Sequence, residues 1–149
     1  MGRPENQMPP ECFYDDKEAE KYTNCTRIIK VQSEMAERCL DLIGIQEVGD
    51  EEEPKFILDL GCGSGLSGEI IDERGHMWWG LDISASMLKV AKEREVEGEI
   101  MYGDIGDGFN IQAGFFDAII SVSALQWLCY SEKKIHDPWQ RLLKLFRSI

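Results

Sequence analysis

The sequence lacks the long apolar segments that mark membrane and secreted proteins. No run of about 18 consecutive apolar residues is present, so we expect no helix that spans a bilayer. The first ten residues, MGRPENQMPP, contain no apolar core of a secretory signal, and Asn6 stands where the myristoylation pattern needs Ser or Thr. These absences predict a soluble intracellular protein.

Cysteine and histidine are too few and too scattered for a metal site or a disulfide framework. The five cysteines are an odd number and form no CxxC pair, and neither of the two histidines has Cys or His at ligand spacing. We therefore expect no metal ligands, and reduced thiols in a reducing compartment.

Positive charge is also scarce. Lys and Arg number 16 against 28 Asp and Glu, which gives a formal net charge of −12. Because phosphate contacts need clustered Lys and Arg, such a chain is a poor general binder of polyanions. In residues 132–149 basic side chains outnumber acidic ones, although a solvated helix face is the more common origin of such a stretch. Binding to nucleic acid would need this patch or a basic partner.

What is present is the pattern of one folded domain in which helices and strands alternate. The length of 149 residues and the 43% hydrophobic content suit a single core. We expect an irregular arm over 1–14, a helix over 26–43 and an acidic linker, which together form an N-terminal part, 1–54. Residues 55–149 form the core domain. Its expected strands cover 56–60, 76–81, 99–103 and 116–121, and its expected helices cover 66–74, 84–97, 125–129 and 138 onward.

Strands that alternate with helices predict an α/β fold with a parallel sheet between two helical layers, a three-layer αβα arrangement. Ligands of such folds bind at the carboxyl ends of the strands. The polar residues at those ends should therefore converge: Asp59 to Gly65, Asp82, Asp104, and Ser121 to Ser123.

The glycine-rich segment 59–65, DLGCGSG, is the strongest motif. Gly63, Gly65 and Gly68 form a literal GxGxxG, and Asp82 follows at the distance of a ribose-binding acid, so a dinucleotide site remains an alternative. However, Asp59 ends the strand directly ahead of the glycines, where a carboxylate would repel a pyrophosphate. S-adenosylmethionine has no phosphate and carries cationic groups, which an acid at this place favours.

The pattern D-x-G-x-G-x-G, followed by an acid at the end of the next strand, resembles the class I methyltransferases, which have a Rossmann-like fold. The resemblance implies S-adenosylmethionine as cofactor, with Asp82 on the ribose hydroxyls and Gly103-Asp104 at the adenine. The expected cofactor-binding residues are Asp59, Gly61, Cys62, Gly63, Gly65, Asp82, Ile83, Met87, Gly103, Asp104, Ile105 and Ser121.

Longer segments narrow the resemblance. PPECFYDDKEAEKY, LDLGCGSGLSGEIIDERGHMWWGLDISASML and SVSALQWLCYSEKK are similar to the eukaryotic 18S rRNA (guanine-N7) methyltransferases, the Williams–Beuren syndrome methyltransferase family. Members of that family continue further and complete a larger sheet. We therefore expect only the N-terminal half of the sheet, about four strands, in this chain.

Methylation at guanine N7 needs no general base, because the N7 lone pair is free at neutral pH. We therefore predict catalysis by orientation and name no catalytic acid or base. Aromatic side chains that stack on the base are the expected substrate contacts, with ordinary packing as the alternative. The candidates are Tyr14, Tyr22, Ser123, Gln126 and Trp127, with Phe13 beside them.

The resemblance also implies partners and a location. A small zinc-binding methyltransferase activator would dock on the strand at 99–103, and 18S rRNA in the nucleus, nucleolus or cytoplasm would be the substrate. Three alternatives remain open: a methyltransferase for a small molecule or protein, a fragment that binds cofactor or activator without activity, and an NAD-dependent oxidoreductase.

Overall fold

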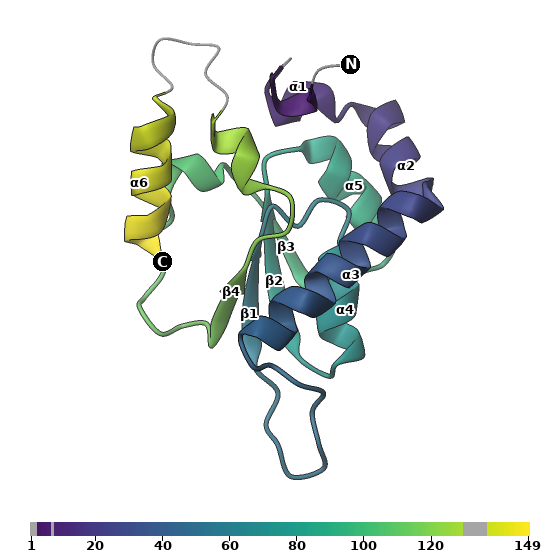
Figure 1. The fold of residues 1–149 in the computed structure, drawn as a ribbon, viewed down its shortest axis with the longest axis vertical. Coiled ribbons are helices and arrows are strands. Elements are labelled where there is room, and N and C mark those ends of the chain that lie inside the picture. The colour runs from purple at the N-terminus through teal and green to yellow at the C-terminus, as the bar shows by residue number, and fades with distance from the viewer. Residues whose placement is uncertain (1–2, 7, 130–136) are drawn as a thin grey trace.

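Four parallel strands form the centre of the molecule (Figure 1). The structure is a computed structural model that describes residues 3–6, 8–129 and 137–149. The strands are β1 (Phe56–Leu60), β2 (Met77–Asp82), β3 (Glu99–Tyr102) and β4 (Ala118–Ile120), in the order β3-β2-β1-β4. Each neighbouring pair is parallel, so the predicted parallel sheet and the position of β3 at its edge are confirmed.

The fourth strand is shorter than the predicted 116–121. Its start is held by a side chain: the backbone N–H of Phe56 donates to Asp117 Oδ2 at 2.7 Å, while the Asp117 N–H donates to the Phe56 carbonyl at 2.8 Å. At its other end Ser121 turns its hydroxyl to the Leu60 carbonyl at 2.8 Å. Regular pairing is therefore limited to the three central residues.

Helices cover both faces of the sheet, which confirms the three-layer prediction. One layer contains α3 (Thr26–Leu42), α4 (Leu66–Glu73) and α5 (Ala85–Glu93), and the other contains α6 (Pro138–Ser148) with the short turns η2 (Ile105–Asp107) and η3 (Leu125–Cys129) (Figure 1). Ser84 caps α5 as expected, since its hydroxyl accepts from the Met87 N–H, and Asp137 caps α6 in the same manner.

The N-terminal arm is more ordered than predicted. It contains η1 (Pro4–Asn6), α1 (Pro10–Phe13) and a helix that the sequence analysis missed, α2 (Asp16–Asn24). Asp15 caps α2, and only Ala19 and Thr23 of this helix are buried. Its apolar stripe is too narrow to reveal a period, so α2 depends on packing against α5 rather than on its own pattern.

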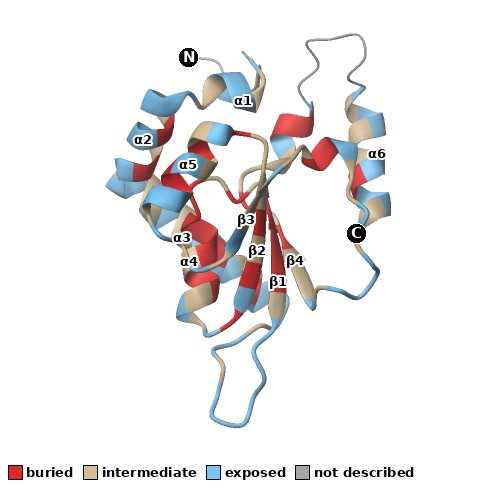
Figure 2. Ribbon diagram, turned by 180° about the vertical axis from the view of Figure 1, so that it is seen from behind, coloured by how far each residue is buried: buried red, intermediate tan, exposed pale blue. Residues whose placement is uncertain are grey.

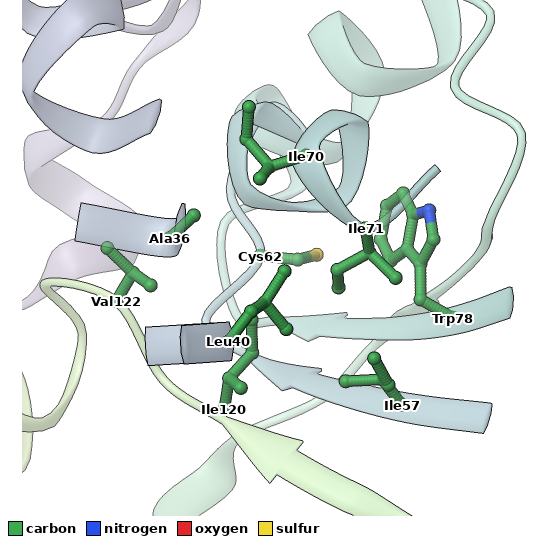
Figure 3. Packing of buried hydrophobic residues seen from close by; sticks show 9 residues of the cluster. All are labelled: Ala36, Leu40, Ile57, Cys62, Ile70, Ile71, Trp78, Ile120 and Val122. Atoms are coloured by element: carbon green, nitrogen blue, oxygen red, sulfur yellow. The ribbon is translucent and has the colours of Figure 1, made fainter. Parts of the chain in front are cut away.

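Alternate residues of β1 point into two cores. Ile57 packs with Ala36 and Leu40 of α3, Ile70 and Ile71 of α4, and Trp78 (Figure 3). Leu58 and Leu60 point the other way, toward Leu128 and Leu145. Figure 2 shows the buried stripe along β1 and β2 between the layers. The helices α3 and α6 are thereby fixed against the same sheet.

Lys133 and Lys134, two of the basic residues in the predicted patch, lie outside the described residues. Among the residues that the structure describes, no helix has both the length and the apolarity needed to cross a membrane.

Candidate functional site

The carboxyl ends of the strands open into a cavity of about 210 Å³. Its walls come from the glycine loop after β1, the ends of β2 and β3, the segment after β4, and the N-terminal arm. Figure 1 shows that α1 and the η3 turn lie at the end of the sheet where the strands have their carboxyl ends. The expected convergence of strand ends is therefore present in the structure.

Bare backbone forms the part of the wall after β1. Gly61, Gly63 and Gly65 have φ angles of 80°, 54° and 84°, a region that favours glycine. A Cβ at position 61 would run into Ala124, and one at position 63 would lie 2.9 Å from Met87 Cε. The turn from β1 to α4 therefore needs these glycines, and a ligand can approach the chain closely there.

Asp82 is held against this loop by two backbone hydrogen bonds. Its Oδ2 accepts from the Gly63 N–H and its Oδ1 from the Ser84 N–H, both at 2.8 Å. Burial raises the pKa of the carboxyl, and hydrogen bonds from the backbones of Ser84, Gly63 and Ile83 partly oppose this shift. A carboxylate offers about four lone-pair sites, so Asp82 can still accept from a pair of hydroxyl groups at the cavity wall.

Asp59 lies deeper in the protein than Asp82 and does not line the cavity. Its side chain is fully buried, and its Oδ2 accepts from the Ser67 hydroxyl, which does line the cavity. Burial is the main reason that the pKa of Asp59 rises to about 7. Two buried oxygen atoms here have no partner among the described residues: Asp59 Oδ1 and Ser64 Oγ. Such orphaned acceptors suit a ligand that brings hydrogen-bond donors or positive charge.

Asp104 lies at the end of β3 and is paired across the fold. Its Oδ1 accepts from the Gly106 N–H at 2.8 Å, and both of its oxygens lie 2.6 Å from Nη2 of Arg141 in α6. Arg141 also lines the cavity. No motif in the sequence pointed to this arginine, because the pairing spans 37 residues and depends on how α6 packs.

Aromatic rings from the N-terminal arm and η3 form a further wall. The Tyr14 ring lies 5.6 Å, between centroids, from the rings of both Tyr22 and Trp127, and these three residues line the cavity. Phe13, also named as a candidate, contacts Trp127 but does not line the cavity. Burial raises the pKa of Tyr22 to about 12 and raises that of Tyr14 as well, so both hydroxyl groups stay protonated.

Most of the residues expected at the site meet around this cavity. Those that line it are Tyr14, Tyr22, Gly61, Cys62, Gly63, Asp82, Ile83, Met87, Gly103, Asp104, Ile105, Ser123 and Trp127.

Four expected residues do not line the cavity: Asp59, Gly65, Ser121 and Gln126. Gly65 precedes α4 and faces Val96, where a Cβ would lie 2.6 Å from Cγ1. Ser121 bonds the end of β1, and Gln126 is exposed and donates to the Ser123 carbonyl at 2.6 Å.

The structure also adds residues that the sequence analysis did not select. Ser64 lies within the glycine motif and Ser67 follows it, so both could have been inferred from the motif. Gln32, Leu128, Arg141 and the segment 9–12 reach the cavity only through the packing of helices. Among the described residues no three His, Cys, Asp or Glu side chains form a group that could hold a metal ion.

Comparisons with known proteins agree with this geometry. Residues 57–145 match the family model described as a methyltransferase domain. An 18S rRNA (guanine-N(7))-methyltransferase of Arabidopsis thaliana is 54% identical over 147 residues, which cover 99% of this chain and 50% of that protein. The 18S rRNA (guanine(1575)-N(7))-methyltransferase of Saccharomyces cerevisiae is 50% identical over 150 residues, which cover 100% of this chain and 52% of that protein. The chain thus spans about half the length of these curated relatives.

Solved structures share the fold at low sequence identity. A TehB-like SAM-dependent methyltransferase from Corynebacterium glutamicum aligns with a TM-score of 0.62 and 22% identity, covering 91% of this chain and 68% of that chain. A chain of the complex between the Haloferax volcanii Trm112 methyltransferase activator and a methyltransferase aligns with a TM-score of 0.63 and 22% identity, covering 90% of this chain and 54% of that chain. The resemblance seen in the sequence is confirmed, and the chain belongs to the methyltransferase domain family.

Proposed function

We propose that this chain carries the cofactor site of an S-adenosylmethionine-dependent methyltransferase that methylates N7 of a guanine in 18S rRNA. The observation that carries the proposal is the identity of 46–54% to 18S rRNA (guanine-N7) methyltransferases from plant, yeast and mammals over nearly the whole chain. The arrangement of the strand ends independently supports S-adenosylmethionine as the cofactor.

The residues around the cavity fit S-adenosylmethionine. Asp82 has free lone pairs for the two ribose hydroxyls, a charge-assisted contact. The unpaired Ser64 hydroxyl lines the cavity beside the exposed backbone of the glycine loop and fits the methionyl ammonium. The fully buried Asp59 carboxyl is linked to the cavity through Ser67, which donates to it and lines the wall. A dinucleotide would instead bring a pyrophosphate to this acidic loop, which disfavours an NAD site. When bound, the cofactor supplies a methyl group on a cationic sulfonium.

The chain's own contribution to the chemistry is orientation. Guanine N7 needs no proton removed, and no side chain of the cavity is required as a base. Tyr14, Tyr22 and Trp127 offer ring surfaces on which an unstacked base can be held beside the strand ends. Ser123, which has a φ of 56°, forms the adjoining wall and accepts from the Gln32 amide at 3.3 Å.

The proposed activator fits the free edge of the sheet. β3 pairs with β2 and is one of the two edge strands of the described sheet, so a partner can add a strand to it. Tyr102 on this strand is 69% exposed, whereas Ile100 packs against the core. We include in the proposal that the enzyme methylates 18S rRNA in the nucleus, nucleolus or cytoplasm.

A transfer assay tests the proposed function. The chain, with and without the zinc-binding activator, is incubated with methyl-labelled S-adenosylmethionine and small-subunit rRNA particles that lack the modification, with Asp82→Asn as the matched control. Label in N7-methylguanine that disappears in the variant is the expected result. If the methyl group is transferred only to a small molecule or a protein, the substrate is not rRNA. If the chain binds the cofactor but transfers no methyl group, it is a cofactor-binding fragment without activity.

A further inference from the structure

A half-buried ion pair joins α6 to the cavity wall. Nη2 of Arg141 lies 2.6 Å from both carboxylate oxygens of Asp104, and the two side chains are only 15% and 23% exposed. A charge-assisted pair that is shielded from water restrains its partners more than an exposed surface pair does. The orientation of the Asp104 carboxylate therefore depends on Arg141.

The backbone is shaped to admit the guanidinium group. A Cβ at position 106 would run into the Arg141 side chain, so the close approach needs Gly106. The Gly106 N–H also donates to Asp104 Oδ1 at 2.8 Å. Leu145, one turn further along α6, packs with Ile105 in the same core cluster. The η2 turn, Asp104 and α6 form one packed unit.

The hydrogen bonds leave one acceptor position of Asp104 available. Oδ1 accepts from both Arg141 and Gly106, whereas Oδ2 accepts only from Arg141 among the described residues. A carboxylate oxygen has two lone pairs, so Oδ2 can take one further donor. Among the described residues that line the cavity, Arg141 is the only cation, and the acids are Glu11, Asp82 and Asp104.

We propose that Arg141 is a positioning residue that fixes Asp104 so that Oδ2 accepts from the exocyclic amine of adenine, and thereby sets the selectivity of the cavity for adenine. This inference rests on the cofactor site proposed above. A base with a carbonyl in place of the amine sets an acceptor against Oδ2 and leaves both unpaired, which lowers its affinity. Without the guanidinium the carboxylate can rotate away, and the discrimination is lost.

Two ligands separate this role from a structural one: S-adenosylhomocysteine, and S-inosylhomocysteine, which has the carbonyl. Their dissociation constants are measured by calorimetry for the wild-type chain and for Arg141→Met, which keeps an unbranched apolar side chain against η2. Arg147→Met, on an exposed position of the same helix, is the matched control.

We expect the wild-type chain and Arg147→Met to prefer the adenosyl ligand, and Arg141→Met to lower that preference about tenfold or more. Equal weakening of both ligands, or an unchanged ratio, would refute the positioning role alone. Failure of the folded wild-type chain to bind either ligand would refute the proposed cofactor site itself. Circular dichroism and the melting temperature of each variant establish that it is folded.

Discussion

Asp59 should make the stability of the chain fall as the pH rises. The side chain is fully buried, and burial raises its pKa from 3.8 to about 7. Because the folded-state pKa lies above the unfolded one, the stabilisation is complete below about pH 4 and is lost as the pH rises through about 7. At about 1.4 kcal/mol for each pKa unit, ionisation should lower the free energy of unfolding by about 4 kcal/mol in total.

Asp59→Asn isolates this effect, because an amide does not ionise. Free energies of unfolding are measured by urea denaturation at a series of pH values for the ligand-free wild-type chain and the variant. The buried amide has a packing cost of its own at every pH, so the comparison is between slopes. Asp72, whose pKa burial also raises, titrates in both proteins and cancels in the difference. The negative charge of Asp82 contributes to the raised pKa of Asp59, so the difference between the two proteins includes the coupling of these two carboxyl groups.

The difference between the two proteins should change by about 4 kcal/mol from about pH 4 to about pH 8. Ser67→Ala gives a second check, since it removes the hydrogen bond that lowers the pKa of Asp59 and should extend the decline to higher pH. Parallel profiles for wild type and Asp59→Asn would show that Asp59 is solvated or otherwise paired, and would refute the reasoning.

Three further predictions concern the core, the substrate side and the sheet edge. Trp78→Ala should lower the free energy of unfolding by about 3–5 kcal/mol in denaturant titrations, because Trp78 is only 2% exposed. Trp139→Ala, at a position that is 70% exposed, should change this free energy by less than about 0.5 kcal/mol. Equal effects of the two substitutions would contradict the assignment of Trp78 to the core. Gln126→Ala should lower methyl-transfer turnover more than cofactor affinity, because it removes the hydrogen bond to the backbone carbonyl of Ser123, which lines the cavity. Unchanged turnover would show that Gln126 has no role on the substrate side. Tyr102→Asp should abolish co-purification with the activator while Tyr102→Phe retains it, because a charge at the exposed edge position disfavours an apolar partner. If both variants still co-purify with the activator, β3 is not the edge on which it docks.

The sheet and the glycine loop were predictable because their signals are local. Phe56 to Leu60 is an apolar run stopped by glycine, and the observed strand has these bounds. Ser84 predicted the start of α5, because serine is a common N-cap residue, and its hydroxyl does cap this helix. The helix α2 had no such signal, since its charged sequence buries only two residues and needs α5 as support.

The sequence predicted which residues lie at the strand ends, but not which of them face the cavity. Sequence spacing places Asp59 and Asp82 at neighbouring strand ends, but it cannot tell which carboxylate faces the cavity. Packing of α4 sets Ser67 between Asp59 and the cavity, so the two acids differ in exposure and in hydrogen-bond partners. Arg141 reaches Asp104 only because α6 folds back over η2, a long-range contact that no local pattern contains.

The proposed cofactor site requires that the strand ends bind S-adenosylmethionine through Asp82. Calorimetric titration of S-adenosylmethionine into the purified chain and into Asp82→Ala, each with and without the activator, tests it most directly. We expect the wild-type chain to bind and the variant to have an affinity at least about tenfold lower, because the variant loses charge-assisted hydrogen bonds. Equal affinities, or no binding by a folded wild-type chain even with the activator present, would contradict it.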